Sequence, residues 1–177
     1  YDDQFWPVLR QGLSSAFAGD GSTLLALADA LTDRGPDGFH SNANTVIYAV
    51  NCLDRPAQGG VEAVQRSVPR FKRAAPIWGP FLAWSELPCV YWPVRSAERP
   101  QPVRAPGSGP IVVVGTTRDP ATPLKWAQAL AGQLQSGRLI TRDGDGHTGF
   151  GRGNSCVDGA VQDWLIKGKV PPPDLKC

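Results

Sequence analysis

The chain has 177 residues, 41% of them hydrophobic, so it is long enough and apolar enough for one packed domain or part of a larger one, and too apolar to be disordered. Its 18 basic and 16 acidic side chains nearly cancel, and the only dense basic stretch, residues 66–73, is short, which argues against a nucleic-acid-binding protein. No apolar run approaches the roughly 20 residues of a membrane-spanning helix, which argues against an integral membrane segment.

Two short amphipathic helices are predicted at the start of the chain. Apolar side chains recur every four residues over 5–17, and the glycines at 19 and 21 end this helix. Ser22 can cap a second helix with a leucine-rich face, which residues 34–38 end.

The next segments are less regular. Residues 44–52 allow a strand or a helix, and we favour a helix. A further helix is predicted over 61–75, where Pro69 should kink or divide it. Four aromatic side chains follow in a proline-rich stretch and could line a substrate pocket, but we expect burial against a neighbouring domain. They are Trp78, Phe81, Trp84 and Trp92.

A proline-rich and glycine-rich stretch over 93–109 predicts a linker and a change of architecture. We therefore expect two regions, a mostly helical region with its linker over 1–105 and a segment of alternating strands and helices over 106–177.

The second region reads as strand, helix, strand, helix. A β-branched run over 110–115 is typical of a strand buried on both faces of a parallel sheet. Thr122 is the predicted N-cap of a helix over 124–134, with proline at its first position. A short strand over 138–141 and a helix over 156–167 complete an α/β pattern.

Two side chains with catalytic potential follow the two predicted strands. Asp119 comes after the first strand and His147, 28 positions later, after the second. Because the carboxyl ends of parallel strands lie at one edge of a sheet, the two side chains should come within hydrogen-bonding reach, as the acid and base of a Ser-His-Asp triad require. The alternatives are that Asp119 caps the turn before Pro120 and that His147 is a surface loop residue.

Four cysteines, Cys52, Cys89, Cys156 and Cys177, lack the short pair spacings of zinc sites, so we expect no metal site. Their even number fits two disulfides and an oxidising compartment. Sequence alone leaves three connectivities open, of which we favour neighbour pairing, and four free thiols are the alternative.

The runs VGTTRDPATPLKWAQALAGQL, LITRDGDGHTGFG and CVDGAVQDWLIKGKVPPPDLKC resemble the C-terminal part of the tripeptidyl-aminopeptidase-like (TAP-like) α/β-hydrolases. The resemblance implies the last strands and helices of an α/β-hydrolase sheet with helical cap remnants, from a secreted or envelope-attached serine peptidase without a cofactor. It makes Asp119 the triad acid and His147 the base, with Thr122 supporting the Asp119 loop. Upstream, AVNCLDRP and PCVYWPV resemble the family's two cysteine motifs, which supports pairing Cys52 with Cys89.

The chain contains no G-x-S-x-G nucleophile elbow and begins at Tyr1 without any methionine. We therefore expect a fragment, inactive alone, whose parent cleaves peptide substrates with a serine from the missing N-terminal half. The serines at 14, 15, 22, 108 and 155 lack the strand-elbow-helix context of a nucleophile. An esterase or lipase of the same fold and a non-catalytic, disulfide-stabilised binding module are the alternatives, and an exposed sheet edge could favour self-association.

Overall fold

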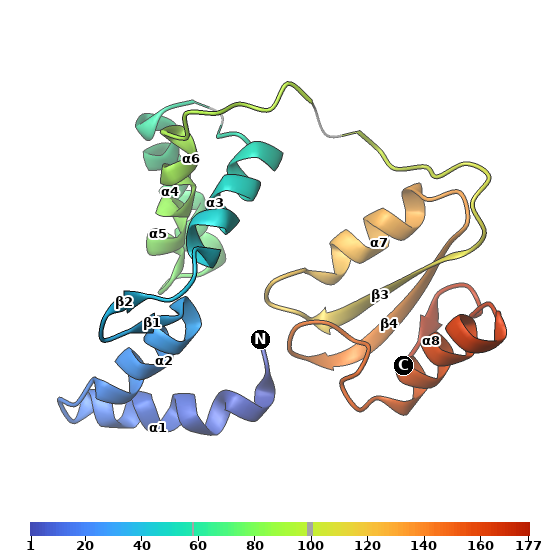
Figure 1. Cartoon of the computed structure of the whole chain (residues 1–177), viewed down its shortest axis with the longest axis horizontal. Coiled ribbons are helices and arrows are strands. Elements are labelled where there is room, and N and C mark those ends of the chain that lie inside the picture. The colour runs from blue at the N-terminus through green and yellow to red at the C-terminus, as the bar shows by residue number, and fades with distance from the viewer. Residues whose placement is uncertain (58, 99–100) are drawn as a thin grey trace. The chain divides into compact units, whose positions relative to one another are not determined.

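The computed structural model describes residues 1–57, 59–98 and 101–177, so positions 99 and 100 of the predicted linker lie outside the described residues. The chain divides into two compact units (Figure 1). One unit joins residues 1–19 to residues 101–177, and the other spans residues 20–100.

The first unit is built on a parallel sheet. Its three strands are β3 (Ile111–Arg118), β4 (Gly137–Asp145) and β5 (Leu175–Lys176), in the order β3-β4-β5. The β3–β4 pairing runs from Ile111 opposite Gly137 to Arg118 opposite Asp145, with an irregularity after Thr116. Both long strands extend further than predicted. The polar residues that follow the apolar runs were predicted to form loops, but they continue the hydrogen-bonded ladder at the end of the sheet.

Two helices cover opposite faces of this sheet (Figure 1). They are α7 (Leu124–Gln133) and α8 (Ser155–Lys167). On the α7 face, Val113 and Leu139 pack with Leu134, and on the α8 face Ile140 packs with Val157 and Val161. Successive strand residues point to opposite faces, so the continuous apolar runs of β3 and β4 supply two cores at once.

The starts of these two helices differ from the predictions. α7 begins at Leu124 after Pro123, with no side-chain cap, so the prediction that Thr122 is its N-cap is wrong. The Thr122 hydroxyl donates to Asp119 instead, a charged acceptor that forms a stronger hydrogen bond than a neutral one. α8 begins one residue earlier than predicted, and Asn154 caps it by accepting from Val157 N.

The N-terminal part of this unit contains the 3-10 helix η1 (Asp3–Phe5) and α1 (Trp6–Phe17). A proline in its first turn supports the start of α1, where a missing N–H costs nothing. The predicted helix over 5–17 is therefore present as α1, and η1 directly precedes it.

The second unit is mainly helical. Its elements are α2 (Ser22–Thr32), β1 (Arg34–Gly35), β2 (Gly38–Phe39), α3 (Ala43–Asp54), α4 (Val61–Ala74), α5 (Gly79–Leu82), η2 (Ala83–Glu86) and α6 (Leu87–Val90). The favoured helix over 44–52 is confirmed by α3. α2 is capped by Gly21 rather than by Ser22, and the short antiparallel pair β1–β2 was not predicted.

Two further expectations for this unit differ from the structure. We expected Pro69 to kink or divide the helix over 61–75; α4 continues through Pro69, so the helix is not divided there, and the hydrogen bond that proline cannot donate is lost within a continuous helix. Of the four aromatic side chains expected to be buried against a neighbouring domain, Trp78, Phe81 and Trp84 are 67%, 72% and 38% exposed, and Trp92 is half-buried, so residues 20–100 do not by themselves bury them.

Two disulfides join the pairs favoured from the sequence. Cys52 of α3 is bonded to Cys89 of α6, and both are buried. Cys156 of α8 is bonded to Cys177, which follows β5.

Among the described residues, no helix is both long enough and apolar enough to cross a membrane.

Candidate active site

Asp119 and His147 lie side by side at the carboxyl ends of β3 and β4. Asp119 directly follows β3, His147 comes two residues after β4, and Nδ1 of His147 is 3.0 Å from Oδ2 of Asp119. The Asp119 side chain is 2% exposed and that of His147 is 30% exposed. The sheet therefore brings together the two residues that the sequence singled out, with the acid buried and the base open to solvent.

The Asp119 carboxylate is surrounded by hydrogen-bond donors. Oδ1 accepts from the backbone N–H groups of Ala121 and Thr122, each at 2.8 Å, and Oδ2 accepts from Thr148 N at 3.1 Å. Burial by itself raises the pKa of Asp119, but these backbone bonds and the contact with His147 outweigh it and hold the pKa well below the ordinary value of 3.8. Asp119 is therefore ionised at neutral pH.

The ionised carboxylate fixes the role of each imidazole nitrogen. An ionised carboxylate only accepts hydrogen bonds, so the proton between the two groups belongs to Nδ1 of His147. In the neutral ring this leaves Nε2 with its lone pair. The pair is arranged so that Nε2 can take up a proton while Asp119 stabilises the imidazolium that results.

Thr122 touches both members of this pair. Its hydroxyl donates to Oδ2 of Asp119 at 2.8 Å and lies 3.3 Å from Nδ1 of His147. Because its single proton is given to Asp119, the oxygen can only accept at His147. The predicted N-cap bond of this hydroxyl to a backbone N–H is absent, and the hydroxyl instead contacts Asp119 directly, in the loop that Thr122 was expected to support.

The N-terminal residues contact the loop that carries His147. His147 N donates to Tyr1 O at 2.7 Å, and the Tyr1 ring meets the imidazole edge-on, with 5.3 Å between the ring centroids. Asp2 forms an ion pair with Arg152 at 2.8 Å. The His147 loop is thus held by a segment nearly 150 residues upstream.

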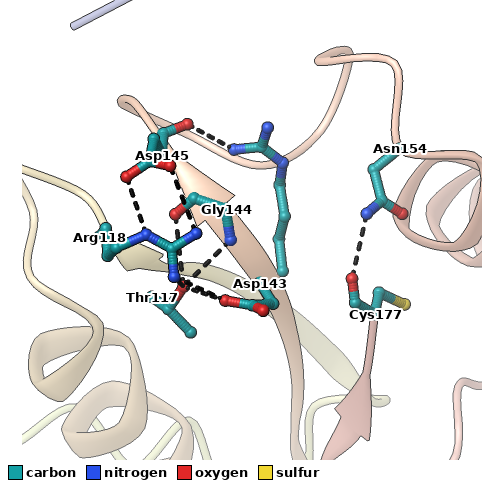
Figure 2. A network of polar contacts seen from close by, with 8 residues as sticks. Thr117, Arg118, Asp143, Gly144, Asp145, Asn154 and Cys177 are labelled. Carbon is teal, nitrogen blue, oxygen red and sulfur yellow. Dashed lines mark hydrogen bonds and ion pairs between the residues drawn. The ribbon is translucent and has the colours of Figure 1, made fainter. Parts of the chain in front are cut away.

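A polar network ties the two strand ends together beside the site (Figure 2). Arg118 lies between Asp143 and Asp145, at 2.8 Å from an oxygen of each. Thr117 donates to Asp143 at 2.8 Å and accepts from Gly144 N at 3.0 Å. These bonds replace regular ladder bonds where the β3–β4 register becomes irregular, and they fix the points from which the Asp119 and His147 loops leave the sheet.

Sequence reasoning missed several contributors to this site. Thr148 and Ala121 act through backbone N–H groups, which leave no side-chain signal. The alternative that Asp119 caps the turn before Pro120 did point to part of this: Asp119 accepts from the N–H groups two and three residues on, and it contacts His147 as well. The dismissed serines lie in or at the start of helices, or, for Ser108, in a turn before β3.

Comparison with known proteins assigns the chain to a family. The TAP-like protein family matches residues 75–177. Serine protease Hip1 of Mycobacterium bovis is 41% identical over 180 residues, and carboxylesterase B of Mycobacterium tuberculosis is 39% identical over 185. Tripeptidyl aminopeptidase of Streptomyces lividans is 31% identical over 179 residues.

Each of these three alignments covers 100% of this chain but only 34%, 35% and 33% of the respective relative. The chain thus spans about a third of the length of the curated relatives that it matches. The match of fold, family and relatives leads to one conclusion: the chain belongs to the TAP-like family of α/β-hydrolases.

Proposed function

We propose that this chain carries the acid and the base of a serine hydrolase, whose nucleophilic serine lies in a part of the protein outside these 177 residues. The observation that carries the proposal is the 3.0 Å contact between His147 Nδ1 and a buried, ionised Asp119 at adjacent strand ends. The names of the relatives, a serine protease, a tripeptidyl aminopeptidase and a carboxylesterase, support the same class of chemistry.

In the proposed mechanism, Nε2 of His147 takes the proton of the serine hydroxyl as it attacks the substrate carbonyl. His147 then gives this proton to the leaving group, and a water molecule repeats the cycle on the acyl-enzyme. Asp119 holds the ring in the Nδ1-protonated form and stabilises the imidazolium, and Thr122 holds Asp119. These steps need no cofactor.

The proposed substrates are peptides. Two of the three relatives above are named as peptidases, and one of them as a tripeptidyl aminopeptidase, which favours removal of short peptides from the N-terminus of a substrate. An ester is the second candidate, supported by the relative named carboxylesterase B. The acid and base do not choose between these acyl substrates, because the pocket around the serine does so.

We also propose that the protein is exported, since its two disulfides persist in an oxidising compartment. The mostly helical region over residues 1–105, which includes the linker, is proposed to derive from a cap that restricts access to the site. β3 lies at an edge of the described sheet, beside a depression of about 560 Å³ with an apolar lining that includes Val113, Trp126 and Phe150. This edge is the proposed contact for the rest of the hydrolase or for a second copy of the chain.

The test is hydrolysis of tripeptide and ester chromogenic substrates by this chain alone and by the longer protein that contains it, each with a fluorophosphonate probe for an active serine. Activity and labelling in the longer protein alone, both lost in His147→Ala, are the expected result. Labelling of this chain by itself would place the nucleophile within it. An inactive, unlabelled longer protein would overturn the proposal.

A further inference from the structure

The residue after His147 has an uncommon backbone conformation. Thr148 has φ 71°, in the left-handed region. A β-branched side chain is an outlier there, and such a conformation persists only where the surrounding structure holds it. The sequence offers no local reason for it, so the cause must lie in the contacts of Thr148.

The contact that fixes the Thr148 carbonyl comes from β3. The Thr116 hydroxyl donates to Thr148 O at 2.9 Å. Thr116 is only 1% exposed, and a hydroxyl at that depth is costly unless it is hydrogen-bonded. Thr116 lies on β3, three residues before Asp119, which directly follows the strand, so one continuous segment carries both the acid and the group that holds the His147 loop.

The loop lies directly on this strand. A Cβ added to Gly149 would come within 2.6 Å of Cγ1 of Val114 and 3.3 Å of Oγ1 of Thr116. Glycine therefore allows the close approach that the hydrogen bond to the Thr148 carbonyl requires.

Both backbone polar groups of Thr148 are hydrogen-bonded at the same time. While its carbonyl accepts from Thr116, its N–H donates to Oδ2 of Asp119 at 3.1 Å. That N–H is one of three backbone donors to the carboxylate. A change in the backbone at Thr148 would withdraw this donor and move the adjacent His147 ring.

We propose that Thr116 is a positioning residue, whose hydroxyl holds Thr148 in the left-handed conformation and thereby sets His147 beside Asp119. Its effect on catalysis rests on the proposed function, but its effect on the geometry of the pair does not. Thr116 differs from Thr122, which touches both side chains of the pair itself.

The structural test compares three variants by amide hydrogen exchange and by the proton resonance of His147 Nδ1–H. Thr116→Val keeps the shape and removes the hydroxyl, and Thr116→Ser keeps the hydroxyl. Thr141→Val is the matched control, because Thr141 is also buried, at 5% exposed, but on β4, and its hydroxyl accepts from Lys176 Nζ.

We expect exchange at the Thr148 amide to rise about tenfold in Thr116→Val, the effect of one lost hydrogen bond, with a shifted Nδ1–H resonance. Thr116→Ser and Thr141→Val should match the unmodified chain in both the exchange rate of the Thr148 amide and the Nδ1–H resonance of His147. An unchanged exchange rate at the Thr148 amide in Thr116→Val, or an equal rise of that rate in Thr141→Val, would overturn the proposal.

The kinetic test uses the longer hydrolase. There Thr116→Val should lower kcat about tenfold at constant KM, since positioning affects the transition state and not substrate binding, and Thr116→Ser should restore it. An unchanged kcat overturns the role in catalysis. If the unmodified longer protein is inactive while the amide effect is present, the proposed function fails and the positioning role stands.

Discussion

Arg152 and Asp2 form an ion pair at 2.8 Å, between Nη1 and Oδ2, across 150 positions of sequence. Nε of Arg152 also donates to Oγ1 of Thr148 at 3.3 Å. Through these contacts the first residues of the chain are attached to the loop that carries His147. The arrangement explains how Tyr1 can meet the imidazole ring without a regular element to hold it.

We expect Arg152→Ala to loosen this attachment with little loss of stability. Both side chains are partly exposed, so the ion pair should contribute below about 1 kcal/mol to the free energy of unfolding. The ring-current shift that Tyr1 imposes on the His147 side-chain protons should nevertheless decrease. Lys167→Ala removes another exposed ion pair, with Asp163, and serves as the control. Unchanged His147 signals in Arg152→Ala would contradict the attachment.

Asp119→Asn should destabilise the first unit by about 2 kcal/mol at pH 7, because an amide N–H₂ would face N–H donors in a buried position. The folded-state pKa of Asp119 is depressed, so its stabilisation is complete above the unfolded-state pKa of about 3.9 and is lost as the pH falls further.

Urea unfolding from pH 7 to pH 2.5 checks this dependence. The difference between the unmodified chain and Asp119→Asn should stay constant above about pH 5 and shrink below about pH 3.9. A difference that grows on acidification would have the wrong sign for a depressed carboxyl pKa.

Gly149→Ala should destabilise the chain by about 1–3 kcal/mol, because the new methyl group would overlap the Val114 side chain. Gly159→Ala is the matched control, since Gly159 lies within α8 and a Cβ there meets nothing within 4 Å. That control should stabilise by about 0.5–1 kcal/mol through helix propensity. Thermal unfolding separates the two, and equal shifts in Tm would show that the loop does not lie against β3.

Replacing Cys156 and Cys177 together by serine should cost about 3 kcal/mol, because the disulfide closes a loop of 21 residues. β5 should then exchange its amides faster, since its short pairing with β4 adds little on its own. The matched variant replaces Cys52 and Cys89, whose disulfide lies in the other unit. If β5 lost its exchange protection equally in both double variants, the result would contradict a local role of the Cys156–Cys177 disulfide in holding β5.

The sequence by itself determined the α/β class of the second half and the pair Asp119 and His147. The β-branched run before Asp119 suits only a strand that is covered on both faces. Two neighbouring parallel strands necessarily place the loops that follow them at one edge of the sheet. The resemblance of the same runs pointed to the family that the comparison then identified.

Only the tertiary structure decided how the pair is held. The hydroxyl of Thr122 has several possible acceptors in sequence, and the position of the Asp119 carboxylate selected one. The contacts of Thr116 with Thr148 and of Tyr1 with His147 join residues 32 and 146 positions apart. Such contacts leave no periodic or local signal, because they depend on which backbone groups the folded loops leave without a partner.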